Sequence, residues 1–225
     1  IAKNSIFMDM LQNGVETSWF DGKEEHTDIV RLVDYDNPEK NCFHVVNQWT
    51  YIECGTNKRP DVIVFVNGLP LVLFELKSPA RSDAGSEDAY QQIQNYKRQI
   101  PSLFVYNAFC VTSDMLHTKV GTITANESRF VEWKSVDGSY EATQYADWKT
   151  PLDGMFPKER LIDILKNFIL FSEDAKILAG YHQYFAVNKA LESVHEAIGG
   201  DGKGGVFWHT QGSGKSLSMV FLAHL

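Results

Sequence analysis

The chain has 225 residues, of which 44% are hydrophobic and 12% aromatic, so it can bury a sizeable core. No apolar run reaches the roughly 18 residues that a membrane span requires, so no membrane partner is expected. The net charge is −8, with 29 acidic against 21 basic residues, which argues mildly against a chain that grips nucleic acid by charge alone. Cys42, Cys54 and Cys110 lack metal-ligand spacing and are expected to be reduced thiols in a cytoplasmic protein.

Hydrophobic periodicity and turn residues predict a mixed α/β chain. Strands are expected at residues 27–35, 43–53, 62–66, 71–77, 103–112 and 129–135, and helices at 86–99, 158–171 and about 183–198. Polar residues with glycine and proline predict a connector at 136–157. The glycine-rich turn 199–205 is expected to lead into a short strand at 206–208.

Two carboxylates and a lysine stand on neighbouring predicted strands. Glu75 and Lys77 are two residues apart and therefore share a strand face. Asp61 opens the preceding strand, and the turn Asn67-Gly68 between the strands sets its register. A three-residue loop or a compensating bulge places Asp61 opposite Glu75, whereas a plain two-residue loop sends Asp61 to the other face.

This residue set suits metal-assisted phosphodiester hydrolysis. Asp61 and Glu75 can hold Mg²⁺ or Mn²⁺, and such a metal polarises a phosphate oxygen and lowers the pKa of a bound water. The Lys77 ammonium can orient that water and offset developing negative charge. The alternative is a surface hairpin with an ordinary Glu–Lys pair, because Asp…Glu-x-Lys is a short and degenerate pattern.

The helix at 86–99 carries a second set of candidate residues. Gln92 and Tyr96 are four residues apart and share a face with Ala89 and Ile93. If this face packs on the sheet, Gln92 and Tyr96 lie beside the carboxylates and can hydrogen-bond the metal ligands or a DNA backbone. The alternative is a polar rim on a helix that only packs the core.

Residues 210–216, Thr-Gln-Gly-Ser-Gly-Lys-Ser, predict a phosphate-binding loop between a strand and an apolar helix. Backbone N–H groups around Thr210, Gly212, Ser213 and Gly214 would cradle the phosphates of ATP. Lys215 would reach the β- and γ-phosphates, and Ser216 would ligate Mg²⁺. His209 stands where the general pattern has its first glycine. The alternative is a plain Gly-Ser-Gly linker.

Gln183, in Gly180-Tyr-His-Gln183, is a candidate adenine-binding residue. A glutamine amide offers one donor and one acceptor, which match N6 and N7 of adenine. The alternative is a solvated glutamine at a helix start.

Several motifs resemble the PD-(D/E)xK nuclease core of the type I restriction enzyme motor subunit, namely Arg59-Pro-Asp61, Phe65-Val-Asn-Gly68, residues 71–77, Gln92-x-x-x-Tyr96 and residues 100–107. The resemblance covers roughly residues 40–225, and the loop 209–216 and the Gln183 element resemble superfamily 2 helicases. It implies catalytic roles for Asp61, Glu75 and Lys77, and a helix at Gln92 and Tyr96 that cleavage requires. That family also has an acidic residue on a helix before these strands, for which Glu16 and Glu25 are candidates.

The resemblance implies an α/β fold in which a PD-(D/E)xK restriction-endonuclease-like core, a mixed sheet flanked by helices, precedes the start of a RecA-like P-loop lobe. The expected division is a nuclease domain at 1–150, a helical connector at 151–175 and a truncated ATPase and translocase domain at 176–225. The implied function is metal-dependent cleavage of double-stranded DNA coupled to ATP-driven translocation. The implied partners are double-stranded DNA and the modification (methyltransferase) and specificity subunits of a type I complex. Two alternatives remain: an ATP-dependent repair nuclease–helicase and an inactive nuclease fold that only docks partners.

Overall fold

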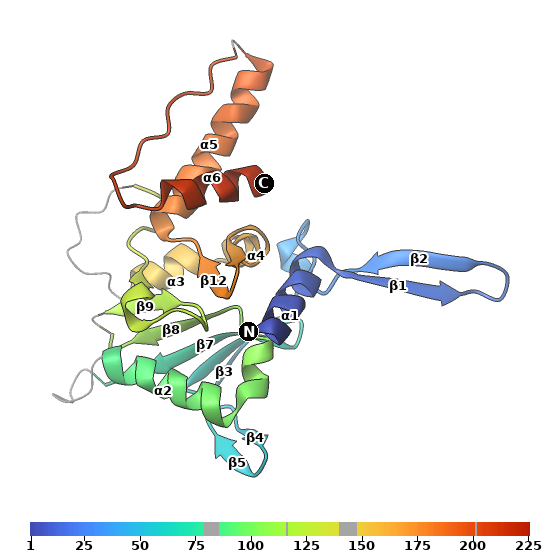
Figure 1. Ribbon diagram of the computed structural model, residues 1–225, viewed down its shortest axis with the longest axis vertical. Helices are drawn as coiled ribbons and strands as arrows, with labels where there is room; N and C mark the ends of the chain where they lie inside the picture. Colours follow the sequence, from blue (N-terminus) through green and yellow to red (C-terminus); the bar gives the residue numbers. More distant parts are fainter. Residues whose placement is uncertain (79–85, 116, 140–147, 201) are drawn as a thin grey trace.

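The computed structural model describes residues 1–78, 86–115, 117–139, 148–200 and 202–225 (Figure 1). Its helices are α1 (Ala2–Asn13), α2 (Ser86–Gln99), α3 (Lys149–Met155), α4 (Lys158–Asn167), α5 (Tyr181–Gly199) and α6 (Lys215–His224), with short 3-10 helices η1 (Pro38–Lys40), η2 (Pro101–Val105) and η3 (Glu127–Arg129). Its strands are β1 (Val15–Phe20), β2 (Glu25–Val30), β3 (Phe43–Asn47), β4 (Tyr51–Glu53), β5 (Thr56–Lys58), β6 (Val62–Val66), β7 (Leu69–Leu76), β8 (Phe109–Ser113), β9 (Thr118–Gly121), β10 (Val131–Glu132), β11 (Ile169–Ser172) and β12 (Ala175–Leu178).

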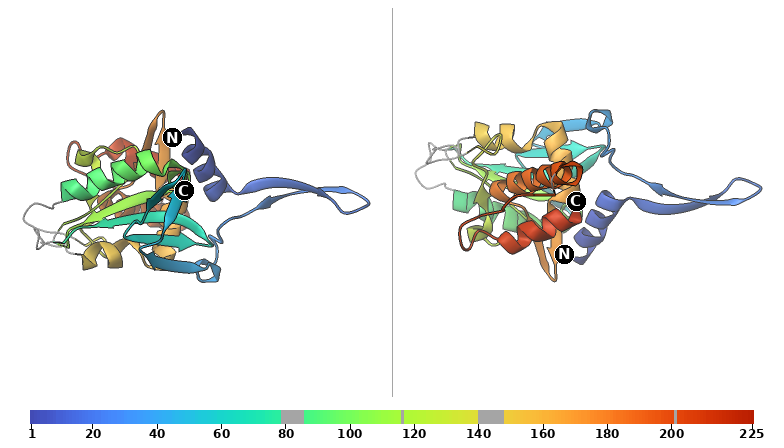
Figure 2. Two further views of the ribbon diagram at one scale, coloured as in Figure 1. Left: turned by 90° about the horizontal axis from the view of Figure 1, so that it is seen from below. Right: turned by 90° about the horizontal axis from the view of Figure 1, so that it is seen from above.

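A six-stranded mixed sheet forms the centre of the molecule. Its strand order is β10-β9-β8-β7-β6-β3, and only the β7–β8 pair is parallel. The parallel pair requires a crossover, and α2 supplies it on one face of the sheet. Helices α3 and α4 cover the opposite face (Figure 2). The predicted mixed α/β class is therefore confirmed.

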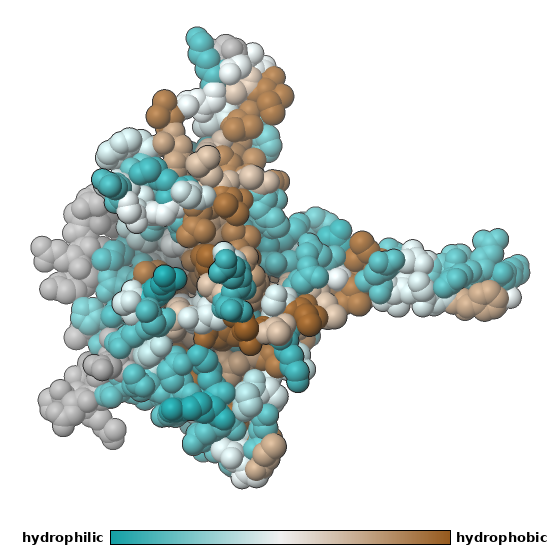
Figure 3. Space-filling model, in the orientation of Figure 1, coloured by the Kyte–Doolittle hydropathy of each residue, from teal (hydrophilic) through white to brown (hydrophobic). Residues whose placement is uncertain are grey.

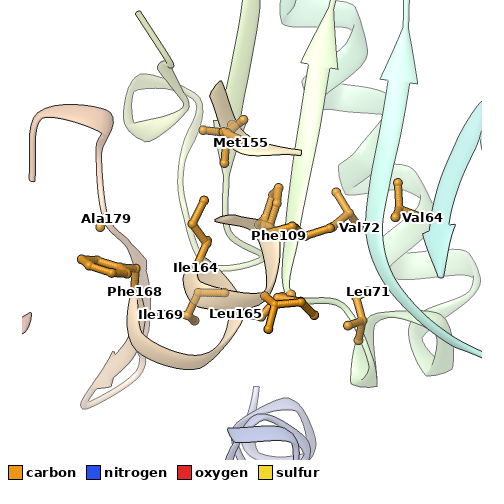
Figure 4. Close-up of a cluster of buried hydrophobic side chains, with 14 of the residues drawn as sticks. Val64, Leu71, Val72, Phe109, Met155, Ile164, Leu165, Phe168, Ile169 and Ala179 are labelled. Atoms are coloured by element: carbon orange, nitrogen blue, oxygen red, sulfur yellow. The ribbon is translucent and has the colours of Figure 1, made fainter. Parts of the chain in front are cut away.

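The two sheet faces bury separate hydrophobic clusters because side chains alternate along each strand. On the α3–α4 side, Val64, Val72 and Phe109 of the sheet pack against Met155 and Leu165 (Figure 4). This cluster continues through Phe168 to Tyr184 of α5 and Phe221 of α6. Residues of the predicted connector at 151–175 thus join the sheet to the last two helices through one continuous core. The predicted domain boundaries themselves stay a prediction.

On the other face, α2 and the segment after it cover the sheet. Ile63, Leu73 and Cys110 of the sheet lie against Ile93 and Tyr96 of α2. This helix forms as predicted, because its apolar residues recur at helical spacing along one side.

Several predicted strands are shorter than expected or are broken. The strand predicted at 43–53 divides into β3 and β4 because Gln48 turns the chain with a positive φ of 51°. The strand predicted at 27–35 is β2, which among the described strands pairs only with β1. Local sequence does not show these breaks because tertiary contacts set them.

Other predicted elements are wrong in type. Most of 103–108 is η2 and a turn, with β8 beginning at Phe109, and 131–132 is the only strand within 129–135. The helix predicted at 158–171 ends at Asn167, and β11 follows it. The strand predicted at 206–208 does not form, and Val206 and Trp208 are exposed there. A single strand without a sheet neighbour has no ladder to complete, which accounts for this difference.

A buried lysine ties the β11–β12 hairpin to the rest of the fold. Lys176 is 3% exposed, and its Nζ donates to Asn4 Oδ1 (2.9 Å) and to the Asn107 carbonyl (2.7 Å). Burial lowers the pKa of Lys176 to about 7. The Lys176 amino group thus links α1, the segment before β8 and β12.

We expect Lys176 to make stability depend on pH in the alkaline range. Between about pH 7 and 10.5 only the unfolded chain holds this proton, so the free energy of unfolding should rise with pH across this window and level off below pH 7, where both states are protonated. Lys176→Met should remove that rise. Urea unfolding of both proteins across this range measures the difference. If the free energies of unfolding of the two proteins changed with pH in parallel, Lys176 would stay charged in the folded protein.

Candidate active site

The pairing of β6 with β7 brings Asp61 and Glu75 to one face of the sheet. Asn67 and Gly68 form a two-residue turn with φ values of 50° and 82°, which pairs Val66 with Leu69. The register then shifts between Val64 and Phe65, because β7 contains one extra residue at this bulge. Val62 consequently pairs with Phe74, so Asp61 directly precedes the paired segment and its charge acts on Glu75. This is the compensating bulge that the sequence required.

Glu75 is buried, and only one of its two carboxylate oxygens has a hydrogen-bond partner among the described residues. Its side chain is 5% exposed, and Oε1 accepts a hydrogen bond from Lys77 Nζ at 2.7 Å. Its other oxygen, Oε2, is buried without a hydrogen-bond partner among the described residues. Lys77 is 23% exposed at the side chain, so its ammonium reaches from the buried carboxylate toward solvent.

Asp61 is held by backbone and side-chain donors. Its Oδ2 accepts the backbone N–H of Leu76 at 2.8 Å, which fixes the carboxylate against β7. Its Oδ1 accepts the side-chain amide of Gln48 at 2.8 Å. Each carboxylate oxygen keeps a further lone pair that can bind a cation.

The electrostatics of the site favour an added positive charge. Burial raises the pKa of Glu75, the hydrogen bond from Lys77 opposes that rise, the charge of Asp61 adds to it, and the nearby Tyr96 hydroxyl lowers the pKa. A buried carboxylate with an unpartnered oxygen beside a second carboxylate is costly when both are ionised. A divalent cation would relieve this repulsion.

Helix α2 places its predicted residues over the carboxylates. Tyr96 is 5% exposed and packs in the cluster on this face, and Gln92 is half-buried one turn earlier. Burial and, after it, the negative charge of Glu75 raise the pKa of Tyr96 to about 12, while the Gln92 side chain acts in the opposite direction. The sequence-predicted set of five residues therefore gathers on one sheet face.

Gln48 is the site residue that sequence reasoning missed. Its backbone N–H donates to the Asp61 carbonyl at 2.8 Å, in addition to its side-chain bond. A glutamine 13 residues before Asp61 has no spacing signal, so only the fold reveals this contact. The candidates Glu16 and Glu25 lie instead on the β1–β2 hairpin, which leaves the molecule on the side opposite the carboxyl end of β7 (Figures 1 and 2).

The loop before α6 adopts a closed, glycine-dependent form. Gly212 and Gly214 have φ values of 82° and 78°, a region that L side chains rarely occupy. Lys215 Nζ donates to the carbonyls of His209 (2.8 Å) and Thr210 (3.0 Å), so the lysine spans the mouth of its own loop. Ser213 also donates its hydroxyl to the Thr210 carbonyl at 2.8 Å. Ser216 is exposed in the first turn of α6.

Gln183 contacts this loop directly. Its Oε1 accepts the Gly180 N–H at 2.9 Å, and its Nε2 donates to the Gly214 carbonyl at 3.1 Å. Both ends of the amide are thus engaged, and an adenine would have to replace these two bonds. An open surface pocket lies here, with lining residues that include Glu132, Lys134, Gly180, Gln183, Gly212, Ser213 and Gly214.

Within the described ranges, no group of three or more His, Cys, Asp or Glu side chains could hold a metal ion. The candidate cation site therefore has two protein carboxylates, Asp61 and Glu75. Mg²⁺ often binds through one or two carboxylates and keeps several waters, so this donor set fits it. In the same part of the chain, no helix is long and apolar enough to cross a membrane.

Comparison with known proteins identifies two matching regions. The profile of the family described as type I restriction enzyme R protein N terminus matches residues 1–129, and that of the SWI2/SNF2 ATPase matches residues 182–225. The type I restriction enzyme HindI endonuclease subunit of Haemophilus influenzae is 41% identical over 99% of this chain and 22% of its own length. The SauCOLORF180P endonuclease subunit of Staphylococcus aureus is 28% identical over 80% of this chain and 19% of its own length. The chain thus spans about a fifth of the length of these relatives.

Proposed function

The chain belongs to the family of type I restriction enzyme R protein N termini, and we propose that it carries a PD-(D/E)xK nuclease site for double-stranded DNA and the start of an ATP-driven translocase lobe. In this proposal the subunit is a type I site-specific deoxyribonuclease. Its partners are double-stranded DNA and the modification and specificity subunits. ATP and Mg²⁺ or Mn²⁺ are its proposed cofactors.

One observation carries the nuclease proposal. Glu75 is buried with its Oε2 lacking a hydrogen bond among the described residues, and the neighbouring charge of Asp61 raises its pKa further. A fold that only docks partners gains nothing from burying an orphan carboxylate oxygen, which costs about 1–3 kcal/mol or more. The cost is explained if the carboxylate is stabilised by a bound cation.

Each residue of the site has a role in this proposal. Asp61 and Glu75 would hold the metal, which when bound polarises the scissile phosphate and supplies an activated water. Lys77, fixed at 2.7 Å from Glu75, would place its ammonium beside the attacked phosphate and offset its developing charge. Gln92 and Tyr96 would orient the DNA backbone or the metal ligands from α2, and Gln48 holds Asp61 in position.

The second part of the proposal concerns ATP. The backbone N–H groups around Thr210, Gly212, Ser213 and Gly214 would surround the phosphates at the start of α6. Lys215 would exchange its two carbonyl partners for phosphate oxygens, and Ser216 would ligate Mg²⁺. Gln183 would exchange its two backbone partners for adenine.

We expect this chain to bind Mn²⁺ with an affinity that depends on the carboxylates of Asp61 and Glu75. Asp61→Asn with Glu75→Gln should weaken binding at least about tenfold, or about 1.4 kcal/mol, because the amides bring no charge. The raised pKa of Glu75 adds a pH test: protons should displace the metal as the pH falls, at a higher pH than for an ordinary carboxylate. Calorimetric titration measures both effects.

The matched control is Glu173→Gln with Asp174→Asn, an exposed carboxylate pair at the β11–β12 turn. These changes should leave Mn²⁺ affinity unchanged. If the unaltered chain, the Asp61–Glu75 variant and this control all bound Mn²⁺ with equal affinity, the result would support an inactive docking fold and not a nuclease.

A further inference from the structure

The β1–β2 hairpin, residues 15–30, projects from the molecule as an arm (Figures 1 and 2). Ten of its twelve strand residues are exposed, and within the described chain its strands pair only with each other. An isolated two-stranded ribbon is marginally stable in water. Nearly all of the arm's surface is therefore free to contact another molecule.

The root of the arm is firmly attached to the body. Gly14 joins α1 to β1 with a φ of 85°, and an added Cβ would lie 2.5 Å from the Ile29 side chain. Helix α1 is in turn held by Asn4, which donates to the carbonyls of Phe104, Val105 and Asn107. The helix from which the arm leaves is therefore anchored to the sheet domain.

Side chains at the tip are ordered before any partner binds. Asp21 accepts the backbone N–H groups of Lys23 and Glu24 at 2.8 and 2.9 Å, and its second oxygen contacts His26 at 2.9 Å. The His26 ring stacks on Trp19 with centroids 5.7 Å apart. This order lowers the entropic cost of binding through the tip.

The arm combines large apolar groups with negative charge. Trp19 and Phe20 are 48% and 68% exposed, and Ile29 and Val30 at the root are also exposed. Figure 3 shows the arm as a mainly hydrophilic surface interrupted by hydrophobic residues. Its carboxylates are Glu16, Asp21, Glu24, Glu25 and Asp28, against Lys23 alone, so five negative charges and one positive charge give a net charge of −4.

This chemistry selects one kind of occupant. DNA is excluded, because phosphates would be repelled by the five carboxylates. Aromatic anchors surrounded by carboxylates match a protein surface that has an apolar pocket with a basic rim. We propose that the β1–β2 arm docks onto such a basic surface of another subunit. The choice of subunit rests on the proposed function, in which the modification and specificity subunits handle DNA and therefore carry basic surfaces.

The full-length subunit and the purified modification–specificity assembly test this proposal. Glu24→Lys with Glu25→Lys should weaken their association roughly tenfold or more, and the loss should shrink at high salt. Phe20→Ser should weaken association by a similar factor with less dependence on salt. Glu173→Lys with Asp174→Lys, an exposed pair with the same charge change, should associate as the unaltered subunit does.

A photo-crosslinker in place of Phe20 supplies a second readout. Crosslinks to a lysine- or arginine-rich segment of the partner assembly would support docking. Crosslinks confined to the subunit's own chain or to DNA would overturn it, as would unchanged affinity of the arm variants in complexes that cut DNA normally. If the arm variants bind with unchanged affinity and cut DNA normally, the proposed function stands and only the docking role of the arm is refuted. If the unaltered subunit fails to bind the assembly, the docking role and the proposed function are both refuted.

Discussion

Glu75→Ala in the assembled full-length subunit is expected to abolish DNA cleavage while ATP hydrolysis stays near wild type. The loss should be about 10²-fold to 10³-fold or more, because the change removes a proposed metal ligand and leaves Lys77 without its carboxylate partner. ATP hydrolysis should persist because the glycine loop around Lys215 makes no hydrogen bond to this carboxylate. Plasmid cutting beside a steady-state ATPase assay measures both activities.

Two companion variants test the same site. Asp61→Ala and Lys77→Ala should each lose cleavage with ATP hydrolysis retained, and Asp36→Ala, an exposed carboxylate of the η1 region, should retain both. Stability should not explain the loss, because Glu75→Ala removes a costly buried charge. Normal plasmid cutting by Glu75→Ala would refute the assignment of the nuclease site.

Lys215→Ala is expected to abolish ATP hydrolysis by the full-length subunit. The variant lacks the ammonium that would bind the β- and γ-phosphates, and the protein cannot replace that charge. Its folded state should change little, because both hydrogen bonds of the Lys215 ammonium are exposed and water can replace it. An ATPase assay with and without linear DNA, together with thermal unfolding, separates the two effects.

The control for Lys215 is Lys189→Ala, an exposed lysine on α5. The Lys189→Ala variant loses one positive charge, as Lys215→Ala does, but from the neighbouring helix α5, and it should hydrolyse ATP at the rate of the unaltered subunit. If Lys215→Ala hydrolysed ATP as fast as the Lys189 variant, the residues before α6 would not be the phosphate loop.

The structure also connects the two candidate sites. One hydrophobic cluster runs from Phe109 of the sheet through Phe168 to Tyr184 and Phe221. Tyr184 follows Gln183, whose amide holds the Gly214 carbonyl. A change in the glycine loop therefore has a continuous packed route to the sheet that carries Glu75.

The sequence alone determined the residue types of the site and much of the fold. The spacing of Glu75 and Lys77 fixed their common face, and the apolar spacing around Gln92 and Tyr96 predicted both α2 and the face on which it packs. The glycines at 212 and 214 predicted a tight loop before a helix. These features are local, because strand and helix periodicity and glycine conformation depend on a few neighbouring residues.

Only the tertiary structure decided the features that depend on distant residues. The extra residue in β7 determines that Asp61 joins Glu75, since a one-residue change of register reverses every side chain of a strand. The contact of Gln48 with Asp61 depends on the turn after β3, and the isolation of β1–β2 depends on the absence of a further sheet neighbour among the described strands. The lack of a hydrogen bond at Glu75 Oε2 is likewise set by the residues packed around it. Burial and pairing are properties of the whole fold, so a pattern of neighbouring residues cannot specify them.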